Sequence, residues 1–540
     1  APLIMALERN TGIKTKVVVD ERSAAFMALG YAAISNEPVA IVCTSGTALL
    51  NYAPAVAEAY YRRIPLIVIS ADRPMEWIDQ DDSQTIRQFE ALGNFVKASY
   101  NLPDSSGSNL KWYANRQIND AITMALSGRK APVHINIQLS EPLSEVSDFE
   151  DEKFRLVEMI QPETGISTLF ARQLGFRLAS PIKVMIVAGF LAPSPRLNKA
   201  LRRLAALPNF IVFTETISNL HGNEFISRID TTLSGLSSEE RENLAPDVVI
   251  TLGGALVSRF VKTYLRKVNP REHWHVGLSH TTIDCFQCLT TRIEIEPEIF
   301  FPQLASAMQP HKSPCNYADR WRVARDKAIS THQAYISKIP WSDLKAFSVF
   351  IPKIPKGANI QLSNGTSIRY AQLMGDCGFH RCDCNRGVSG IDGSTSTAIG
   401  AALAYNSGMT VLITGDMSAQ YDLGALATND IPANFKIIVM CNGGGGIFRF
   451  INTTSDLPEL EKNFAAQHAV RLPLESLAKG FGFGFYRASD EEELRCVLPQ
   501  FIQQDDKPSI LAIETPPQID AEILKNYFKR SKIFKNSSHE

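Results

Sequence analysis

Apolar runs alternate with amphipathic segments along the first 140 residues. Short β-branched or apolar runs predict strands at 16–20, 39–43, 65–70 and 133–137. Helices are expected at 22–34 and 48–61. Near-continuous apolar strands joined by helices are typical of a parallel sheet that is covered on both faces.

The same alternation returns twice further along the chain. A second group of strands is predicted at 183–187, 210–213, 247–252 and 274–276. A third group is predicted at 359–362, 410–414, 435–441 and 509–514, with helices at 395–404 and 424–429. The acidic stretch 141–163 and the polar stretch 310–356 are predicted linkers. We therefore expect an α/β protein with three consecutive doubly wound parallel-sheet domains, at 1–150, 165–310 and 350–540.

Charge and hydropathy exclude several classes of function. The 540 residues carry 55 Lys+Arg against 56 Asp+Glu, so the chain has no strong field for nucleic acid or an anionic membrane. The longest apolar stretch, Ile64 to Ala71, is far shorter than the roughly 20 residues that a membrane span needs. We expect a cytoplasmic protein without stable membrane insertion.

The cysteines and the central glycines suggest no cofactor of their own. Nine cysteines, mostly isolated, are typical of reduced thiols, and we interpret the pair Cys285 and Cys288 and the group from Cys377 to Cys384 as loop thiols rather than metal ligands. The second domain has Gly253 and Gly254 but no GxGxxG, which favours a structural spacer over a dinucleotide site.

One pair of polar residues in the third domain points to chemistry. Asp416 ends one predicted strand and Asn442 ends a later one, with one strand–helix–strand crossover between them. In a right-handed crossover the carboxyl ends of such strands are neighbours or near neighbours, so both side chains can face one point. A carboxylate, an amide oxygen and a backbone carbonyl suit Mg²⁺ or Ca²⁺, completed by diphosphate oxygens. Gly443 to Gly446 let a backbone approach phosphates closely.

The Gly-Asp followed about 25 residues later by Asn resembles the signature of the thiamine diphosphate enzymes. That family also uses a glutamate between a strand and a helix, and "VVVDERSAAF" places Glu21 in this context. The resemblance implies that Glu21 is catalytic: it hydrogen-bonds the pyrimidine ring of the cofactor and favours the imino form, which takes the proton from the thiazolium carbon. It further implies a pyrimidine-binding first domain, a diphosphate-binding third domain, and thiamine diphosphate with Mg²⁺, or Mn²⁺, as cofactors.

Longer strings resemble the menaquinone-pathway synthases of that family. They include "ADRP", "QTIRQ" and "NRGVSGIDG". This branch is a transferase of the transketolase class that decarboxylates 2-oxoglutarate and adds the product to isochorismate. The family also implies a homodimer or homotetramer, in which the glutamate of one subunit serves the cofactor of the other.

The resemblance assigns roles residue by residue. Both substrates are dianions, and an arginine fork matches a carboxylate. The implied substrate residues are Arg73, Gln84, Arg259, Asn364, Arg369 and Arg386. The implied cofactor residues are Glu21, Ser389, Gly390, Ile391, Asp416, Met417, Ser418, Asn442, Gly444, Gly445, Ile447 and Phe448. Ile391 matches the residue that props the bent cofactor and Phe448 a pocket wall. The metal ligands are Asp416, Asn442 and the carbonyl of Gly444.

Two departures from the family pattern affect the expected activity. A "SPGSRN"-like segment that precedes the equivalent of Ala1 is absent here, and Gly365 follows Asn364 where the family has Ser. We therefore expect this chain to be weakly active or inactive, and a restored front segment to raise turnover. Two alternatives stay open: a thiamine enzyme acting on pyruvate, such as an acetolactate synthase or decarboxylase, and a catalytically silent homologue that binds the cofactor.

Overall fold

The computed structural model describes the chain apart from residues 11, 105–107, 142, 144–153, 163, 280, 309–314, 452, 504–505 and 534–540. It divides into two compact units. The first comprises Ala1–Pro162, Asn385–Ser407 and Tyr421–Pro432, and the second comprises Glu163–Cys384, Gly408–Gln420 and Ala433–Glu540. No helix within the described ranges is long and apolar enough to cross a bilayer.

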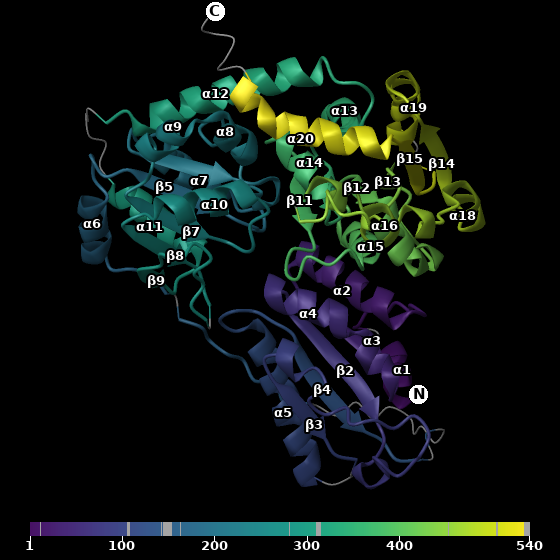
Figure 1. Cartoon of the computed structure of the whole chain (residues 1–540). Helices are drawn as coiled ribbons and strands as arrows, with labels where there is room; N and C mark the ends of the chain where they lie inside the picture. Colours follow the sequence, from purple (N-terminus) through teal and green to yellow (C-terminus); the bar gives the residue numbers. More distant parts are fainter. Residues whose placement is uncertain are drawn as a thin grey trace, which may run out of the picture. The chain divides into compact units, whose positions relative to one another are not determined.

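The first unit is built on a parallel sheet in the order β1-β2-β4-β3. Its strands are β1 (Val39–Cys43), β2 (Leu66–Asp72), β3 (Ser99–Leu102) and β4 (Val133–Gln138). The helices are α1 (Pro2–Arg9), α2 (Glu21–Ser35), α3 (Thr47–Asn51), α4 (Ala53–Arg62), α5 (Ser108–Leu126) and α15 (Ser394–Ala404) (Figure 1). Alternate residues of β2 are buried and the others are half-buried; Leu66 and Val68 pack in one core cluster and Ile67 packs against another, so both faces of the strand are covered.

Helix α15, from late in the sequence, packs closely against α2. A Cβ on Gly30 would lie 2.0 Å from the carbonyl oxygen of Thr397, and one on Gly400 would lie 1.9 Å from that of Met27. Two glycines therefore allow the backbones of these helices to touch along α2, the helix that begins at Glu21.

Two sequence predictions in this unit are wrong. Residues 16–20 form no strand with any described residue, and Val17 and Val19 are 80% and 95% exposed. Their β-branched side chains favour a strand only where a partner supplies a ladder and a packing surface, and neither is present here. The single helix predicted at 48–61 is two helices, α3 and α4, because Pro54 has no N–H to donate and the helical bonding breaks at Tyr52.

The second unit contains two further parallel sheets. One has the order β6-β5-β7-β8-β9 and the other β11-β10-β12-β13-β15-β14. The strands of the first are β5 (Val184–Ala188), β6 (Phe210–Thr214), β7 (Val248–Leu252), β8 (Glu272–Val276) and β9 (Thr291–Ile293). Those of the second are β10 (Asn359–Leu362), β11 (Arg381–Cys384), β12 (Thr410–Gly415), β13 (Phe435–Cys441), β14 (Gly484–Ala488) and β15 (Ser509–Glu514).

Helices cover these two sheets. Around the first lie α6 (Thr168–Arg177), α7 (Pro195–Ala205), α8 (Ile229–Gly235), α9 (Ser238–Asn243), α10 (Arg259–Val268), α11 (Pro297–Ala307) and α12 (Tyr317–Ile336). With the second lie α13 (Asp343–Phe350), α14 (Ser367–Met374), α16 (Asp416–Tyr421), α17 (Gly446–Phe450), α18 (Leu474–Gly480), α19 (Glu491–Gln503) and α20 (Pro517–Ile533). The three parallel sheets confirm the predicted α/β class; the predicted domain boundaries stay a prediction.

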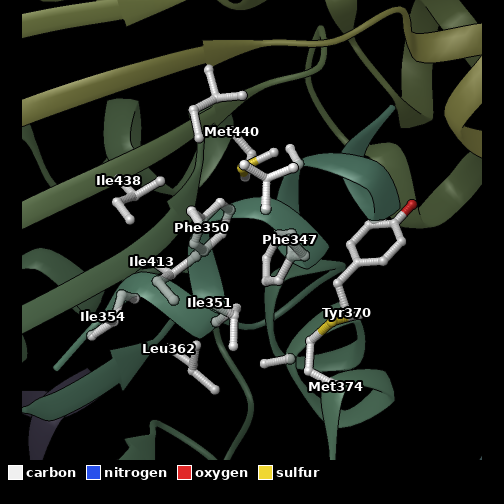
Figure 2. Packing of buried hydrophobic residues seen from close by; sticks show 14 of the residues in the cluster. Phe347, Phe350, Ile351, Ile354, Leu362, Tyr370, Met374, Ile413, Ile438 and Met440 are labelled. Carbon is white, nitrogen blue, oxygen red and sulfur yellow. The ribbon is translucent and has the colours of Figure 1, made fainter. Parts of the chain in front are cut away.

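The stretch 310–356, predicted to be a linker, is largely helical, and that prediction is wrong. It forms α12 and α13, which bury Tyr317, Trp321, Phe347 and Phe350. Figure 2 shows Phe347 and Phe350 packed among Ile413, Ile438 and other core residues of the last sheet. Large apolar residues three or four positions apart form one helix face, and this spacing outweighs the polar average composition. About half of the other predicted linker, 141–163, lies outside the described residues, and its described residues 154–162 are exposed and form no helix or strand.

Two smaller predictions in this part of the chain are also corrected. Cys382 and Cys384 are buried in β11 rather than lying in a loop. The helix predicted at 424–429 is a 3₁₀ turn, Leu423–Ala427, and the α-helix begins earlier, at Asp416. No group of three or more His, Cys, Asp or Glu in the described part of the chain is arranged to hold a metal ion.

Candidate functional site

Asp416 and Asn442 lie at the same edge of one sheet. Asp416 follows β12 and Asn442 follows β13, and the two strands pair directly and in parallel, with Gly415 opposite Met440. The predicted proximity of their strand ends is therefore confirmed. A cavity of about 630 Å³ adjoins Asp416 and is also lined by Gly443 and residues after β15, among others. Its volume lies within the range of small-molecule sites.

The carboxylate of Asp416 is held by backbone N–H groups. Met417 donates to Oδ1 at 2.7 Å, Gly443 donates to Oδ2 at 2.9 Å, and Gly444 donates at 3.0 Å to Oδ2 and 3.2 Å to Oδ1. Burial raises the pKa of Asp416, and these N–H groups oppose that rise because they stabilise the charged form. The glycine loop and the carboxylate thus fix each other's position.

Asn442 is 3% exposed, and its amide has one satisfied and one unsatisfied end. Nδ2 donates to Oδ2 of Asp343 at 2.7 Å. Oδ1 is buried and has no hydrogen-bond partner among the described residues. Such an oxygen is costly unless something else binds it. An orphaned amide oxygen and a carboxylate that follow two paired strands are the kinds of oxygen ligand that Mg²⁺ prefers, so these residues fit a hard divalent cation.

Gly444 has a conformation and a position that only glycine tolerates. Its φ is +97°, and a Cβ would lie 2.1 Å from the carbonyl oxygen of Ala465. Its own carbonyl accepts the N–H of Gly446 at 2.8 Å and keeps a second lone pair. Gly445 donates its N–H to the carbonyl of Ala465 at 2.8 Å, which closes the loop.

Arg449, which was not predicted from the sequence, binds this glycine loop through two backbone carbonyls. It is 4% exposed and donates to the carbonyls of Asn442 at 3.2 Å and Gly443 at 2.8 Å. Glu461 pairs with it at 2.8 Å. Arg449 lies on α17 after Ile447 and Phe448, whose ring centroid lies 5.9 Å from that of Phe464. Met417 and Ser418, also predicted for the cofactor, lie on α16 directly after Asp416.

Glu21 is the first residue of α2. The preceding Asp20 caps the helix by accepting the N–H groups of Arg22 and Ser23. Burial and, next, the charge of Glu21 raise the pKa of Cys43 to about 12; burial, then Cys43, then Glu21 raise the pKa of Tyr52. The Tyr52 hydroxyl donates to the carbonyl of Val42 at 2.9 Å. The partly exposed carboxylate of Glu21 thus lies near the thiol of Cys43 and the phenol of Tyr52.

The loop that carries the predicted residues Arg386, Ser389, Gly390 and Ile391 is anchored by Glu58. Oε1 of this buried carboxylate accepts the N–H of Gly387 at 2.8 Å, and Oε2 accepts that of Val388 at 2.7 Å. Arg62, one turn along α4, donates to Oδ1 of Asn385 at 3.0 Å. Ser389 has a positive φ of +65°. Neither Glu58 nor Arg62 was predicted, because a Glu and an Arg one turn apart read as an ordinary exposed helix pair.

Arg73 and Gln84 lie on segments that converge on a buried glutamine. Gln88 accepts the N–H of Gly46 at 2.7 Å and donates to the carbonyl of Ala71 at 3.0 Å and to Oδ1 of Asn136 at 3.1 Å. Arg73 follows directly after β2 and pairs with Glu141 at 2.8 Å and Asp82 at 3.3 Å. Gln84 is exposed, with a φ of +56°.

The remaining predicted substrate residues lie in the second unit. Asn364 is buried, and its Oδ1 accepts the Cys384 thiol at 3.4 Å. Arg369 donates to the carbonyl of Gly365. Burial raises the pKa of Asp230 to about 6, and the nearby charge of Arg369 partly opposes this rise. Asp230 accepts the Ser258 hydroxyl, and the exposed Arg259 begins α10 directly after Ser258. The structure therefore brings Arg259 and Arg369 to one region, which spacing in the sequence does not show.

Comparisons with known proteins place two parts of the chain in one family of enzymes. Residues 1–91 match the family "Thiamine pyrophosphate enzyme, N-terminal TPP binding domain", and residues 367–513 match "Thiamine pyrophosphate enzyme, C-terminal TPP binding domain".

Curated relatives match nearly the whole chain. A 2-succinyl-5-enolpyruvyl-6-hydroxy-3-cyclohexene-1-carboxylate synthase of Porphyromonas gingivalis is 40% identical over 98% of this chain and 92% of its own length. Proteins of the same name from Flavobacterium psychrophilum and Flavobacterium johnsoniae are each 39% identical over 98% of this chain and 94% of their own lengths. The chain therefore belongs to the 2-succinyl-5-enolpyruvyl-6-hydroxy-3-cyclohexene-1-carboxylate synthase family of thiamine diphosphate enzymes.

Proposed function

We propose that this protein is a thiamine diphosphate- and Mg²⁺-dependent transferase of menaquinone biosynthesis, which decarboxylates 2-oxoglutarate and adds the remaining four-carbon unit to isochorismate. The observation that carries the proposal is the near full-length similarity to synthases named for this product. The oxygen-lined edge at Asp416 and Asn442 supports it, because it offers ligands for the metal that would hold a diphosphate.

Each part of the candidate site has a role in this reaction. Asp416, Asn442 and the carbonyl of Gly444 hold Mg²⁺, and the loop glycines leave room for phosphate oxygens. Bound thiamine diphosphate supplies the electron sink for loss of CO₂ from a 2-oxo acid. Glu21, at the start of α2, would hydrogen-bond the pyrimidine ring of the cofactor.

The substrates determine the roles of the remaining residues. Two dianions need several fixed donors, and the proposed set is Arg73, Gln84, Arg259, Asn364, Arg369 and Arg386. Ile391 and Phe448 shape the apolar wall that orients the cofactor and excludes water. Since Arg73 already pairs with Glu141 and Asp82, a substrate carboxylate at Arg73 must compete with two carboxylates of the protein.

We further propose that the protein works in the cytoplasm as a homodimer or homotetramer, with Glu21 of one subunit serving the cofactor of the other. Light scattering of the purified protein, with and without cofactor, tests the assembly. Mixing Glu21→Gln subunits with Asp416→Ala subunits tests the sharing: regained activity supports shared sites, and two inactive homodimers that stay inactive when mixed contradict them.

The proposed reaction is tested by following isochorismate consumption with 2-oxoglutarate, thiamine diphosphate and Mg²⁺. The control is Glu21→Gln, which keeps the shape of the side chain and removes its charge. Consumption that is lost in the control and on chelation of the metal supports the proposal. Turnover of pyruvate in place of 2-oxoglutarate would assign a different thiamine enzyme, and cofactor binding without any product would indicate a silent homologue.

A further inference from the structure

The buried carboxylate of Asp343 contacts the predicted metal ligand Asn442 from the side opposite to its free oxygen. Asp343 begins α13, in the stretch first expected to be a linker, and is 1% exposed. Its Oδ2 accepts Nδ2 of Asn442 at 2.7 Å, and its Oδ1 accepts the hydroxyl of Thr515 at 2.7 Å. Both oxygens are therefore committed to a donor.

The position of Asp343 is itself fixed by the fold. Its backbone N–H donates to Oδ1 of Asp520 at 2.6 Å, and Ser342 caps the same helix by accepting the N–H of Lys345 at 3.3 Å. Trp341 anchors the approach to α13 by donating to the carbonyl of Glu514 at 2.8 Å. Figure 2 shows Phe347 and Phe350, further along α13, packed in the core. Asp343 is thus a rigid acceptor.

A rigid acceptor decides which way an amide points. Oδ2 of Asp343 accepts from Nδ2 of Asn442 and Oδ1 is taken by the Thr515 hydroxyl, so the amide of Asn442 has its NH₂ toward Asp343 and its oxygen away. The oxygen on the other side of the amide, Oδ1 of Asn442, is buried and has no partner in the described part of the chain. Without the carboxylate, both orientations of the amide become accessible, and one of them presents NH₂ to a cation.

We infer that Asp343 is a positioning residue that fixes the amide of Asn442 with its oxygen toward the metal. The inference rests on the proposed function, because it takes Asn442 to be a ligand of Mg²⁺. Removing such a supporting partner typically weakens metal affinity about 10- to 100-fold. Asp343 itself touches neither metal nor substrate in this role.

The isosteric variant Asp343→Asn gives the sharpest test. If Thr515 keeps its bond to the remaining oxygen, the new NH₂ points at Asn442 and favours its inverted amide. We expect the Mg²⁺ concentration that gives half-maximal binding of thiamine diphosphate to rise about tenfold or more. Binding is followed by the change in tryptophan fluorescence when Mg²⁺ is added to the cofactor-free protein in the presence of thiamine diphosphate. Asp506→Asn is the control, since it makes the same carboxylate-to-amide change at an exposed residue before β15, and it should stay within about twofold of the parent protein.

A reciprocal exchange separates positioning from a general structural role. Asn442→Asp alone places two carboxylates together, but the double variant Asp343→Asn with Asn442→Asp restores an NH₂-to-carboxylate bond and leaves one oxygen free for the metal. We expect the double variant to bind Mg²⁺ more tightly than either single variant. Urea unfolding of each cofactor-free variant checks that all four proteins are folded.

The possible outcomes are distinct. An Asp343→Asn variant with the parent's Mg²⁺ dependence, or a double variant no better than the single ones, overturns the inference while the proposed function stands. Cofactor binding by the parent protein that needs no divalent cation overturns the metal assignment, and with it the role of Asp343. Weakened single variants together with a rescued double variant establish the inference.

Discussion

The carboxylate of Glu58 accepts the backbone N–H of Gly387, 2.8 Å away and more than 300 residues later in the chain. With the second bond, to Val388, it ties α4 to the loop that carries Arg386 and Ile391. A Cβ on Gly387 would lie 2.6 Å from the carbonyl oxygen of Glu58, so the contact is too close for any larger residue. One buried side chain thus positions several residues that the sequence predicts to bind cofactor and substrate.

Glu58→Gln should disturb this loop without changing its volume. The glutamine NH₂ would face a backbone N–H, leaving a buried donor unpaired at a cost of about 1–3 kcal/mol in the free energy of unfolding. We expect urea denaturation to show this loss and KM for 2-oxoglutarate to rise. Replacing the exposed Glu37 by Gln is the control, and equal stability of the two variants would contradict the anchoring role.

The stability of the protein should depend on pH through Asp422. This carboxylate is buried, and burial raises its pKa from 3.8 to about 6, although it accepts the N–H and hydroxyl of Ser396 at 2.7 and 2.8 Å. The folded state therefore binds the proton more tightly than the unfolded state. Its contribution to stability is fully present below pH 3.8 and is lost as pH rises toward 6.

Asp422→Asn removes this titration with little change in shape. A shift of about two pH units corresponds to about 3 kcal/mol, so the free energy of unfolding of the parent protein should fall by about that amount relative to the variant between pH 4 and pH 7. Urea unfolding at several pH values measures the difference. Parallel pH curves for the two proteins would show that Asp422 is not the group responsible.

Gly444→Ala should displace the glycine loop at 443–446, which binds the carboxylate of Asp416. The added Cβ meets the carbonyl oxygen of Ala465 at 2.1 Å in a backbone with φ of +97°, so the loop has to move and its N–H leaves Asp416. We expect at least a tenfold rise in the Mg²⁺ concentration needed for cofactor binding. Gly357→Ala, whose Cβ meets nothing within 4 Å, is the control, and the prediction fails if both variants bind Mg²⁺ alike.

Gln88→Ala should separate substrate binding from cofactor binding. The change leaves the N–H of Gly46 and the carbonyl of Ala71 without their buried partner, which loosens the segments next to Arg73 and Gln84. We expect KM for the anionic substrates to rise several-fold, while the affinity for thiamine diphosphate stays close to that of the parent. Replacement of the exposed Gln80 by Ala provides the comparison, and a loss of cofactor affinity that matches the rise in KM would argue against this division.

Local patterns were sufficient for the strands and for one part of the site. The runs 39–43, 359–362, 435–441 and 509–514 are strands with the predicted bounds, because continuous apolar segments of that length have few other ways to be buried. Asp416 and Asn442 were predicted to be near each other because parallel strands place their carboxyl ends at one edge of the sheet. The strand predicted at 16–20 was wrong because a β-branched run forms a strand only beside a partner strand, and the local sequence does not show whether one is present.

What the sequence determined by itself was thus the alternation of strands and helices, the family, and the loop chemistry at Asp416, Asn442 and Gly444. The tertiary structure decided which remote residues support that chemistry. Asp343, in a stretch of polar composition, and Glu58, in an ordinary helix, act through hydrogen bonds to residues about 100 and more than 300 positions away. Such partners depend on chain crossings and burial, which long-range packing sets and local periodicity does not encode.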